Sequence, residues 1–346
     1  FLFWRGFFFK RNMKKKIALF LLVSCIAPTV FSQQTVLKKG TVLEALPVND
    51  SLPETFTLYL PTSFSTDKTW PLLVVFDLEG REVQALSMFL HAAEEEGYVL
   101  AAPRARDTAS LADNMAITTR AVQRVMDLLP IQKSRIYTAG TGSGGRYANL
   151  VPTLSRDVHG TISIGANITN TELLNVKRPF HFIGIVNKKN YNYPGLLTSQ
   201  RFLDRYRFPN QILIHSKDRD WPEPAYLKRA LRLFTLGAMR EKLVPMDSVF
   251  IERSYRQDLH QANTLKNSMK LLLAEHYISG MMGVYGAYKN LDSLRSIQRD
   301  IRRNKVYKNM KRAENAALLK ESLLKEDYLY YMEEDLITYN FNNLGW

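Results

Sequence analysis

The segment from Arg135 to Leu150 restricts the fold of this chain more than any other. Residues 136–138 are the β-formers Ile, Tyr and Thr, four glycines follow between 140 and 145, and helix-forming residues resume at Arg146. Glycines placed this closely allow two stretches of backbone to approach each other, because they carry no Cβ. The segment therefore predicts a buried strand, a tight turn and a helix, which is a building block of an α/β sheet.

The rest of residues 33–242 repeats this alternation of strands and helices. Short apolar runs such as Leu72–Phe76 are typical of strands that are buried on both faces. The other expected strands are Thr55–Pro61, Tyr98–Ala102, Thr161–Ile164, His181–Val186 and Gln211–His215, and the expected helices are Val83–Glu95, Ala109–Leu129 and Tyr226–Met239. This order predicts an α/β fold with a doubly wound, mostly parallel sheet.

Strand patterns stop near Leu243, and residues 243–346 form an all-helical C-terminal region by their apolar spacing. The expected helices span residues 258–277, 282–302, 306–324 and 326–339. Helices that follow one another in this way predict a small bundle or a short tetratricopeptide-like array. The abrupt ending at Trp346 leaves a truncated C-terminus open as an alternative.

The N-terminal residues predict export. Met13 and three lysines precede the apolar run Ile17–Val30, which is the pattern of a signal peptide over residues 13–32. Residues 1–12 would then be upstream translation without a structural role. The protein is expected to be periplasmic or secreted and to keep no transmembrane segment after cleavage. The alternative is a lipoprotein with lipid on Cys25, the only cysteine of the chain.

The 346 residues carry a net charge of +14, and a basic run extends from Arg295 to Arg312. The ordinary interpretation of such a run is a solvated helix face, with an anionic lipid or sugar as the alternative. An exported protein is not expected to bind nucleic acid. The sequence shows no metal-ligand grouping and no phosphate-binding glycine loop, so we expect neither a metal nor a cofactor.

The turn at 139–146 resembles the nucleophile elbow of secreted α/β-hydrolase esterases, which runs from a strand into Ala-Gly-x-Ser-Gly-Gly-x-Arg. The sequence matches this pattern without a gap on Ala139, Gly140, Gly144 and Arg146. The match places Gly142 at the serine position, and Ser143 follows one residue later. The resemblance covers about residues 54–239. It implies a sheet of α/β-hydrolase type and a Ser-acid-His triad in that chain order.

The resemblance also assigns the other two triad positions. The segment 190–193 resembles the family's Asp-Tyr-Asn-Tyr loop, so Asn190 stands at the acid position. The segment that ends in Trp221 and Pro222 resembles the family's His-x-Trp-Pro, so Arg219 stands at the histidine position. A guanidinium group stays protonated and cannot act as a general base.

Two functions follow from this pattern. The first is a catalytically inactive hydrolase-fold protein that serves as a binding or scaffold module, with degenerate triad positions at Gly142, Asn190 and Arg219. The alternative is a serine esterase that uses Ser143 in a shifted elbow, with His215 as the base and Asp218 or Asp220 as the acid.

A small anionic ligand is the binding hypothesis that accompanies the first function. Arg219 would place a fixed positive charge in the cleft, and Tyr191, Tyr193 and Trp221 lie on the loops beside it. The alternative is a surface ion pair between Arg219 and Asp218 or Asp220. The sequence does not identify a protein partner.

Overall fold

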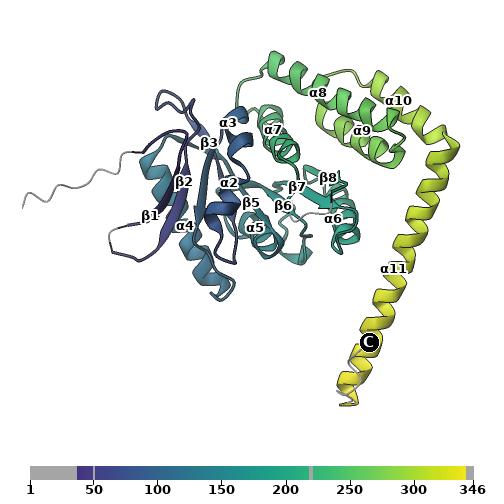
Figure 1. The fold of residues 1–346 in the computed structure, drawn as a ribbon, viewed down its shortest axis with the longest axis horizontal. Coiled ribbons are helices and arrows are strands. Elements are labelled where there is room, and N and C mark those ends of the chain that lie inside the picture. Colours follow the sequence, from purple (N-terminus) through teal and green to yellow (C-terminus); the bar gives the residue numbers. More distant parts are fainter. Residues whose placement is uncertain (1–36, 50, 218–220, 340–346) are drawn as a thin grey trace, which may run out of the picture. The chain divides into compact units, whose positions relative to one another are not determined.

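A single mixed sheet forms the centre of the computed structural model, which describes residues 37–49, 51–217 and 221–339 (Figure 1). Its strands are β1 (Val42–Pro47), β2 (Thr55–Tyr59), β3 (Trp70–Phe76), β4 (Val99–Pro103), β5 (Ile131–Thr141), β6 (Val158–Ile164), β7 (His181–Asn187) and β8 (Asn210–His215). In the described residues the strand order is β1-β2-β4-β3-β5-β6-β7-β8. The pairs β1–β2 and β2–β4 are antiparallel, and all other pairs are parallel.

Helices cover both faces of the sheet. The helices of this part are α2 (Glu82–Ser87), α3 (Leu90–Glu96), α4 (Leu111–Leu128), α5 (Gly142–Leu154), the short 3-10 helix η1 (Thr171–Leu173), α6 (Tyr193–Arg205) and α7 (Pro224–Arg240). Successive residues of β7 show the two faces: Ile183 packs in the core with α3 and α7, whereas Phe182 packs in a second core with α6. Parallel strands buried on both faces explain the apolar runs of the sequence.

The C-terminal region is helical. It contains α8 (Ser248–Asn267), α9 (Leu271–Tyr285), α10 (Asp292–Arg303) and α11 (Lys305–Ile337). Residues Leu271, Ala274 and Ile278 of α9 belong to the same apolar core as α7 and the sheet. Residues 38–346 accordingly form one compact unit by their contacts, and the proposed boundary at 242–243 stays a prediction.

The predicted fold class is confirmed: a mostly parallel sheet of α/β-hydrolase type lies between two helix layers and is followed by helices. Several expected boundaries were wrong. The helix expected at 83–95 is interrupted at Met88–Phe89, and α6 was not predicted at all. The helix expected at 258–277 is broken at residues 268–270, where Met269 takes a left-handed conformation with φ of 58°.

One further correction concerns the last helix. The sequence predicted two helices, 306–324 and 326–339, but α11 is continuous over 33 residues. No glycine or proline interrupts Lys305–Ile337, so nothing in the sequence stops the helix between these two segments. No helix among the described residues combines the length and apolarity that a membrane span requires. Residues 1–36, with the signal-peptide prediction and Cys25, lie outside the described residues.

Candidate site at the carboxyl ends of β5, β7 and β8

The turn between β5 and α5 has the geometry of a sharp strand-to-helix elbow. Thr141 ends the strand with extended dihedrals, and Gly142 begins the helix with φ of 54°. This left-handed value is costly for residues with a Cβ, so glycine fits the position. A Cβ built on Gly142 meets no atom within 4 Å, and the residue is exposed. The tip of the turn therefore has space for a side chain but carries none.

The glycines on either side of Gly142 have a different role. A Cβ on Gly140 would lie 2.4 Å from the carbonyl of Gly144, and a Cβ on Gly144 would lie 2.4 Å from the carbonyl oxygen of Phe76. The start of α5 thus presses against both β5 and the end of β3. Glycines two residues before and two residues after Gly142 match the spacing of the G-x-S-x-G elbow, with Gly142 in the place of the serine.

Ser143 lies in the first turn of α5 and is exposed. Its position is one residue beyond the tip of the elbow. The strand that leads to it, β5, is separated from β8 by β6 and β7. At about 4.8 Å per strand, this places the ends of β5 and β8 roughly 14 Å apart.

His215, the alternative base, ends β8 and is only 3 % exposed. Its ring packs beside Tyr226 with 5.7 Å between the ring centroids, and Nδ1 has no hydrogen-bond partner in the described part of the chain. Burial lowers the pKa of His215, and the nearby Glu223 carboxylate partly offsets this. No interaction recorded between described residues joins His215 to Ser143.

Asn190 lies in the turn that follows β7, and its side chain serves that turn. Its Oδ1 accepts a hydrogen bond from the backbone N–H of Asn192 at 2.8 Å, and its carbonyl oxygen accepts one from Tyr193. The Asn192 side chain in turn donates to the carbonyl oxygen of Gly165, 2.6 Å away, at the end of β6. Asparagine is favoured in such a turn, because its side-chain oxygen accepts a hydrogen bond in place of a backbone carbonyl oxygen. Aspartate could accept the same bond.

The residues predicted to bind a ligand contact different elements of the fold. Tyr191 is 69 % exposed, and its hydroxyl accepts a hydrogen bond of 2.7 Å from Arg146 of α5. Tyr193 is buried, and its hydroxyl donates to Glu314 of α11 at 3.2 Å. Trp221 packs edge-on against Phe89, with 6.0 Å between the ring centroids. Arg219, like Asp218 and Asp220, lies outside the described residues.

The structure therefore brings the elbow and the acid-position loop together, through Arg146 and Tyr191. It does not place Tyr193 beside Tyr191 in one pocket. A second link, which the sequence did not reveal, joins the loops after β7 and β8: the side-chain amide of Asn187 donates to the carbonyl oxygen of Lys217, and its Oδ1 accepts from Lys189 N. No sequence motif marks Asn187, because both of its partners are backbone groups.

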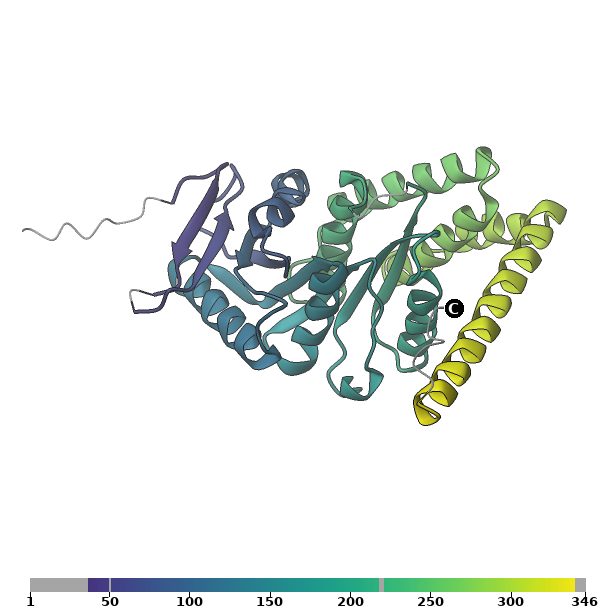
Figure 2. The same cartoon turned by 60° about the horizontal axis from the view of Figure 1, so that its bottom comes forward.

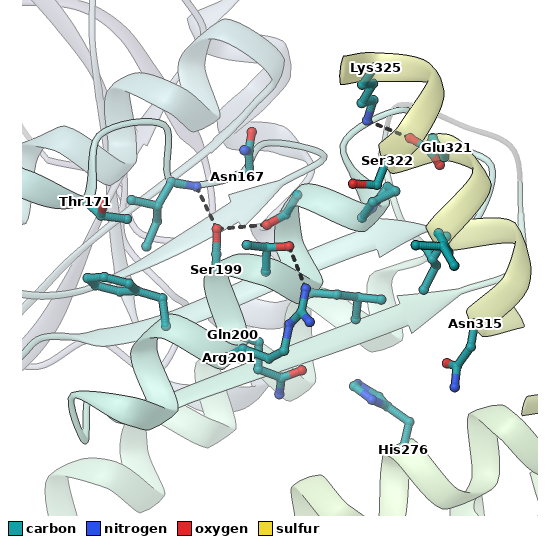
Figure 3. Close-up of a pocket in the computed structure, with 18 of the residues that line it drawn as sticks. Asn167, Thr171, Ser199, Gln200, Arg201, His276, Asn315, Glu321, Ser322 and Lys325 are labelled. Carbon is teal, nitrogen blue, oxygen red and sulfur yellow. Dashed lines mark hydrogen bonds and ion pairs between the residues drawn. The ribbon is translucent and has the colours of Figure 1, made fainter. Parts of the chain in front are cut away.

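A cavity of about 990 Å³ lies away from the elbow, between α6 and α11 (Figure 3). Several of its polar side chains already have partners. Ser199 accepts from Ile168 N and donates to Gly195 O, Arg201 donates to Thr198, and Lys325 pairs with Glu321. The sequence pattern did not reveal this cavity, because no helix was predicted at the position of α6.

Among residues 37–49, 51–217 and 221–339, no three His, Cys, Asp or Glu side chains group as metal ligands.

Neither a protein-family model nor a curated protein sequence matches the chain. Solved structures do match. An esterase of Pyrobaculum calidifontis is 12 % identical over 58 % of this chain and 86 % of its own, with a TM-score of 0.47. The fluorophosphonate-binding serine hydrolase F of Staphylococcus aureus is 16 % identical over 57 % of this chain and 98 % of its own, with a TM-score of 0.42.

An α/β-hydrolase enzyme from a Medee basin deep-sea metagenome library is 14 % identical, over 51 % of this chain and 81 % of its own, with a TM-score of 0.42. At such identities and TM-scores these similarities concern the fold alone. What identifies the fold of this chain as the α/β-hydrolase type is its own strand order, together with the helices on both faces of the sheet.

Proposed function

We propose that this chain is an exported hydrolase-fold protein that acts as a binding or scaffold module and not as an enzyme. The observation that carries the proposal is the elbow itself. Gly142 occupies the left-handed tip of the turn, between two glycines that the close backbone contacts require. The position from which an elbow presents its nucleophile has no side chain.

The neighbouring positions support the same proposal. Asn190 is held in its own turn by Asn192 N, and an amide cannot stabilise an imidazolium ion with a full charge. His215 is buried against Tyr226, on a strand three places from β5. The esterase alternative needs Ser143 and His215 to act together across this separation.

A fluorophosphonate reagent tests the proposal directly. The wild-type protein should remain unlabelled and should hydrolyse a short-chain nitrophenyl ester no faster than its Ser143→Ala variant. Labelling that disappears in Ser143→Ala, with turnover of about 1 per second or more, would establish the esterase instead. Tyr191→Phe is a matched control, because it removes another exposed hydroxyl and leaves both Gly142 and Ser143 unchanged.

The anionic ligand is the second part of the proposal. Arg219 supplies the charge in this hypothesis. Arg146 of α5, which donates a hydrogen bond to Tyr191 in the loop after β7, is a second positive charge near the acid-position loop. Thermal-shift measurements with small carboxylates should show stabilisation of the wild type that Arg219→Ala lacks. Equal stabilisation of both proteins would remove Arg219 from the binding site.

Export is the third part, and it depends on residues 13–32. Expression with the native N-terminus in a Gram-negative host should give a periplasmic product that begins at Gln33, as read by intact mass. A product that keeps Met13 would contradict export, and a mass increase from lipid on Cys25 would favour the lipoprotein alternative.

A further inference from the structure

Helix α11 exposes an apolar stripe that the rest of the described residues leave uncovered. Leu319, Leu323, Tyr330 and Ile337 follow one another at spacings of four and seven residues, so they lie along one side of the helix. They are 62 %, 52 %, 63 % and 77 % exposed. Isolated exposed apolar residues are common, but a row of this length on one helix marks an interaction surface.

The stripe is not the side by which α11 packs against its own fold. Tyr307 is the residue of α11 that is buried, Glu314 binds Lys188 and Tyr193, and Leu318 packs against the α6 core. Leu319 lies about 100° around the helix from Leu318, at the edge of the α6–α11 cavity. In both ribbon views the C-terminal half of α11 extends past α6 (Figure 1, Figure 2).

Charge is divided unevenly along the same helix. Residues 305–325 contain six basic and two acidic side chains, whereas residues 326–337 contain five acidic side chains and none that is basic. A second helix of the same sequence therefore complements this one only if it runs in the opposite direction. A parallel pair would place basic against basic and acidic against acidic.

We infer that two copies of this chain associate through an antiparallel pairing of their α11 helices. A two-fold axis beside residue 321 places Leu319 opposite Leu323 of the second copy. The same axis places Lys308 opposite Glu334, and Arg312 opposite Tyr330. Such a surface is complementary to itself, as the interface of a symmetric dimer must be.

The length of the helix suits this role. The 33 residues of α11 span about 50 Å. Apolar residues at intervals of four and seven residues, flanked by opposite charges, are the pattern by which paired helices set their partner and direction. The acidic half makes a lipid surface a poor alternative, because it would repel anionic headgroups.

Sedimentation equilibrium of the purified chain tests the inference. The wild type should be dimeric at tens of micromolar. Lys308→Glu/Arg312→Glu and Glu333→Lys/Glu334→Lys should each weaken dimerisation by about tenfold or more, since each makes both ends of the pair alike in charge. An equimolar mixture of the two variants should dimerise again, because an antiparallel pair then joins opposite charges at both ends.

Arg299→Glu/Arg303→Glu on α10 is the matched control, because it changes the charge by the same amount on another exposed helix face. This control should dimerise like the wild type. A monomeric wild type at hundreds of micromolar would overturn the inference, and so would a mixture that stays monomeric. A monomer whose stripe is protected from hydrogen exchange would show that another segment of the same chain covers it. Circular dichroism establishes that each variant keeps its helices.

Discussion

At the scale of the residue, the glycines of the elbow separate into two kinds. Gly140 and Gly144 are glycine because backbone lies 2.4 Å from where their Cβ atoms would be. At Gly142 only the left-handed backbone conformation favours glycine, since a Cβ there would meet no atom within 4 Å. The close contacts shape the turn, and the open position is where a side chain could stand.

Alanine substitutions should reveal this difference. Gly140→Ala should cost about 3 kcal/mol of unfolding free energy or more, because a Cβ is forced into backbone that cannot move independently. Gly142→Ala should cost only about 1–2 kcal/mol, the usual penalty of a left-handed residue. Urea unfolding measures both. A larger loss at Gly142 than at Gly140 would contradict the geometry of the elbow.

At the scale of the element, α11 is attached to the sheet domain by Glu314. Its side chain is 15 % exposed and binds Lys188 at 2.9 Å, Lys311 at 2.9 Å and the Tyr193 hydroxyl. Burial raises the pKa of Glu314, but the hydrogen bonds from Lys188 and Lys311 outweigh it and lower the pKa overall. The carboxylate thus stabilises the folded state above its ordinary pKa, and this contribution is lost as the pH falls through the lowered value.

Glu314→Gln should release the first half of α11 from the β7–α6 loop. We expect a loss of about 1–3 kcal/mol, because the Lys188 ammonium group loses its charged partner. Hydrogen exchange should rise in residues 307–322 while β5 and β6 stay protected. Glu321→Gln, which removes only a pair to Lys325 on the same helix, is the control. Equal exchange in both variants would show that Glu314 does not attach the helix.

Helix α7 contacts the C-terminal helices through a buried polar cluster around Asp258, which is 1 % exposed. Its carboxylate accepts from Arg232 at 2.6 Å and pairs with Arg229 at 3.3 Å. It also accepts from the hydroxyls of Tyr277 and Tyr285, both at 3.0 Å. Buried charges are stable only when all of them are paired, so removing one leaves the others without compensation.

Asp258→Asn should therefore cost about 3–5 kcal/mol. Since α7 and α9 share a core with the sheet, the loss should lower the stability of the sheet and the helices together. The unfolding temperature should therefore fall by the same amount in calorimetry and in tryptophan fluorescence. Glu252→Gln on the same helix α8 should shift the calorimetric and the fluorescence transition little, because the Glu252 side chain is 39 % exposed whereas that of Asp258 is buried. Separate transitions for the two regions would favour the boundary at 242–243.

At the scale of the whole molecule, the sequence predicted the sheet well because its signals are local. Apolar runs and glycine spacing located β2 to β8, and four motif residues predicted Gly142 at the serine position. The sequence did not predict where Tyr193 and Trp221 point, because their partners, Glu314 and Phe89, are distant in the chain. It also missed α6, and with it the cavity beside α11.

Histidines buried in this fold make its stability depend on pH. Burial, together with the charge of Arg240, lowers the pKa of His181 to about 3, and burial also lowers the pKa of His215 and His276. The unfolded chain then binds protons first as the pH falls. The stability that these neutral histidines contribute is fully present above about pH 6.5, the ordinary pKa of histidine. It decreases as the pH falls from there toward the lowered pKa values of the folded protein.

Between pH 7 and pH 5 we therefore expect the unfolding free energy of the wild type to fall. Each of these histidines contributes at most about 1.4 kcal/mol per pH unit below 6.5. His181→Gln, which cannot be protonated, should reduce this slope even if it lowers stability at pH 7. His91→Gln is the control for replacing a histidine on the exposed side of α3, where His91 pairs with Glu95. Burial raises the pKa of Glu96, so carboxylates also affect the slope of the wild type. The difference in slope between the wild type and His181→Gln, from urea unfolding at pH 7, 6 and 5, therefore isolates the effect of His181. A slope that His181→Gln does not change would contradict the lowered pKa, because it would mean that His181 binds protons equally in the folded and the unfolded protein.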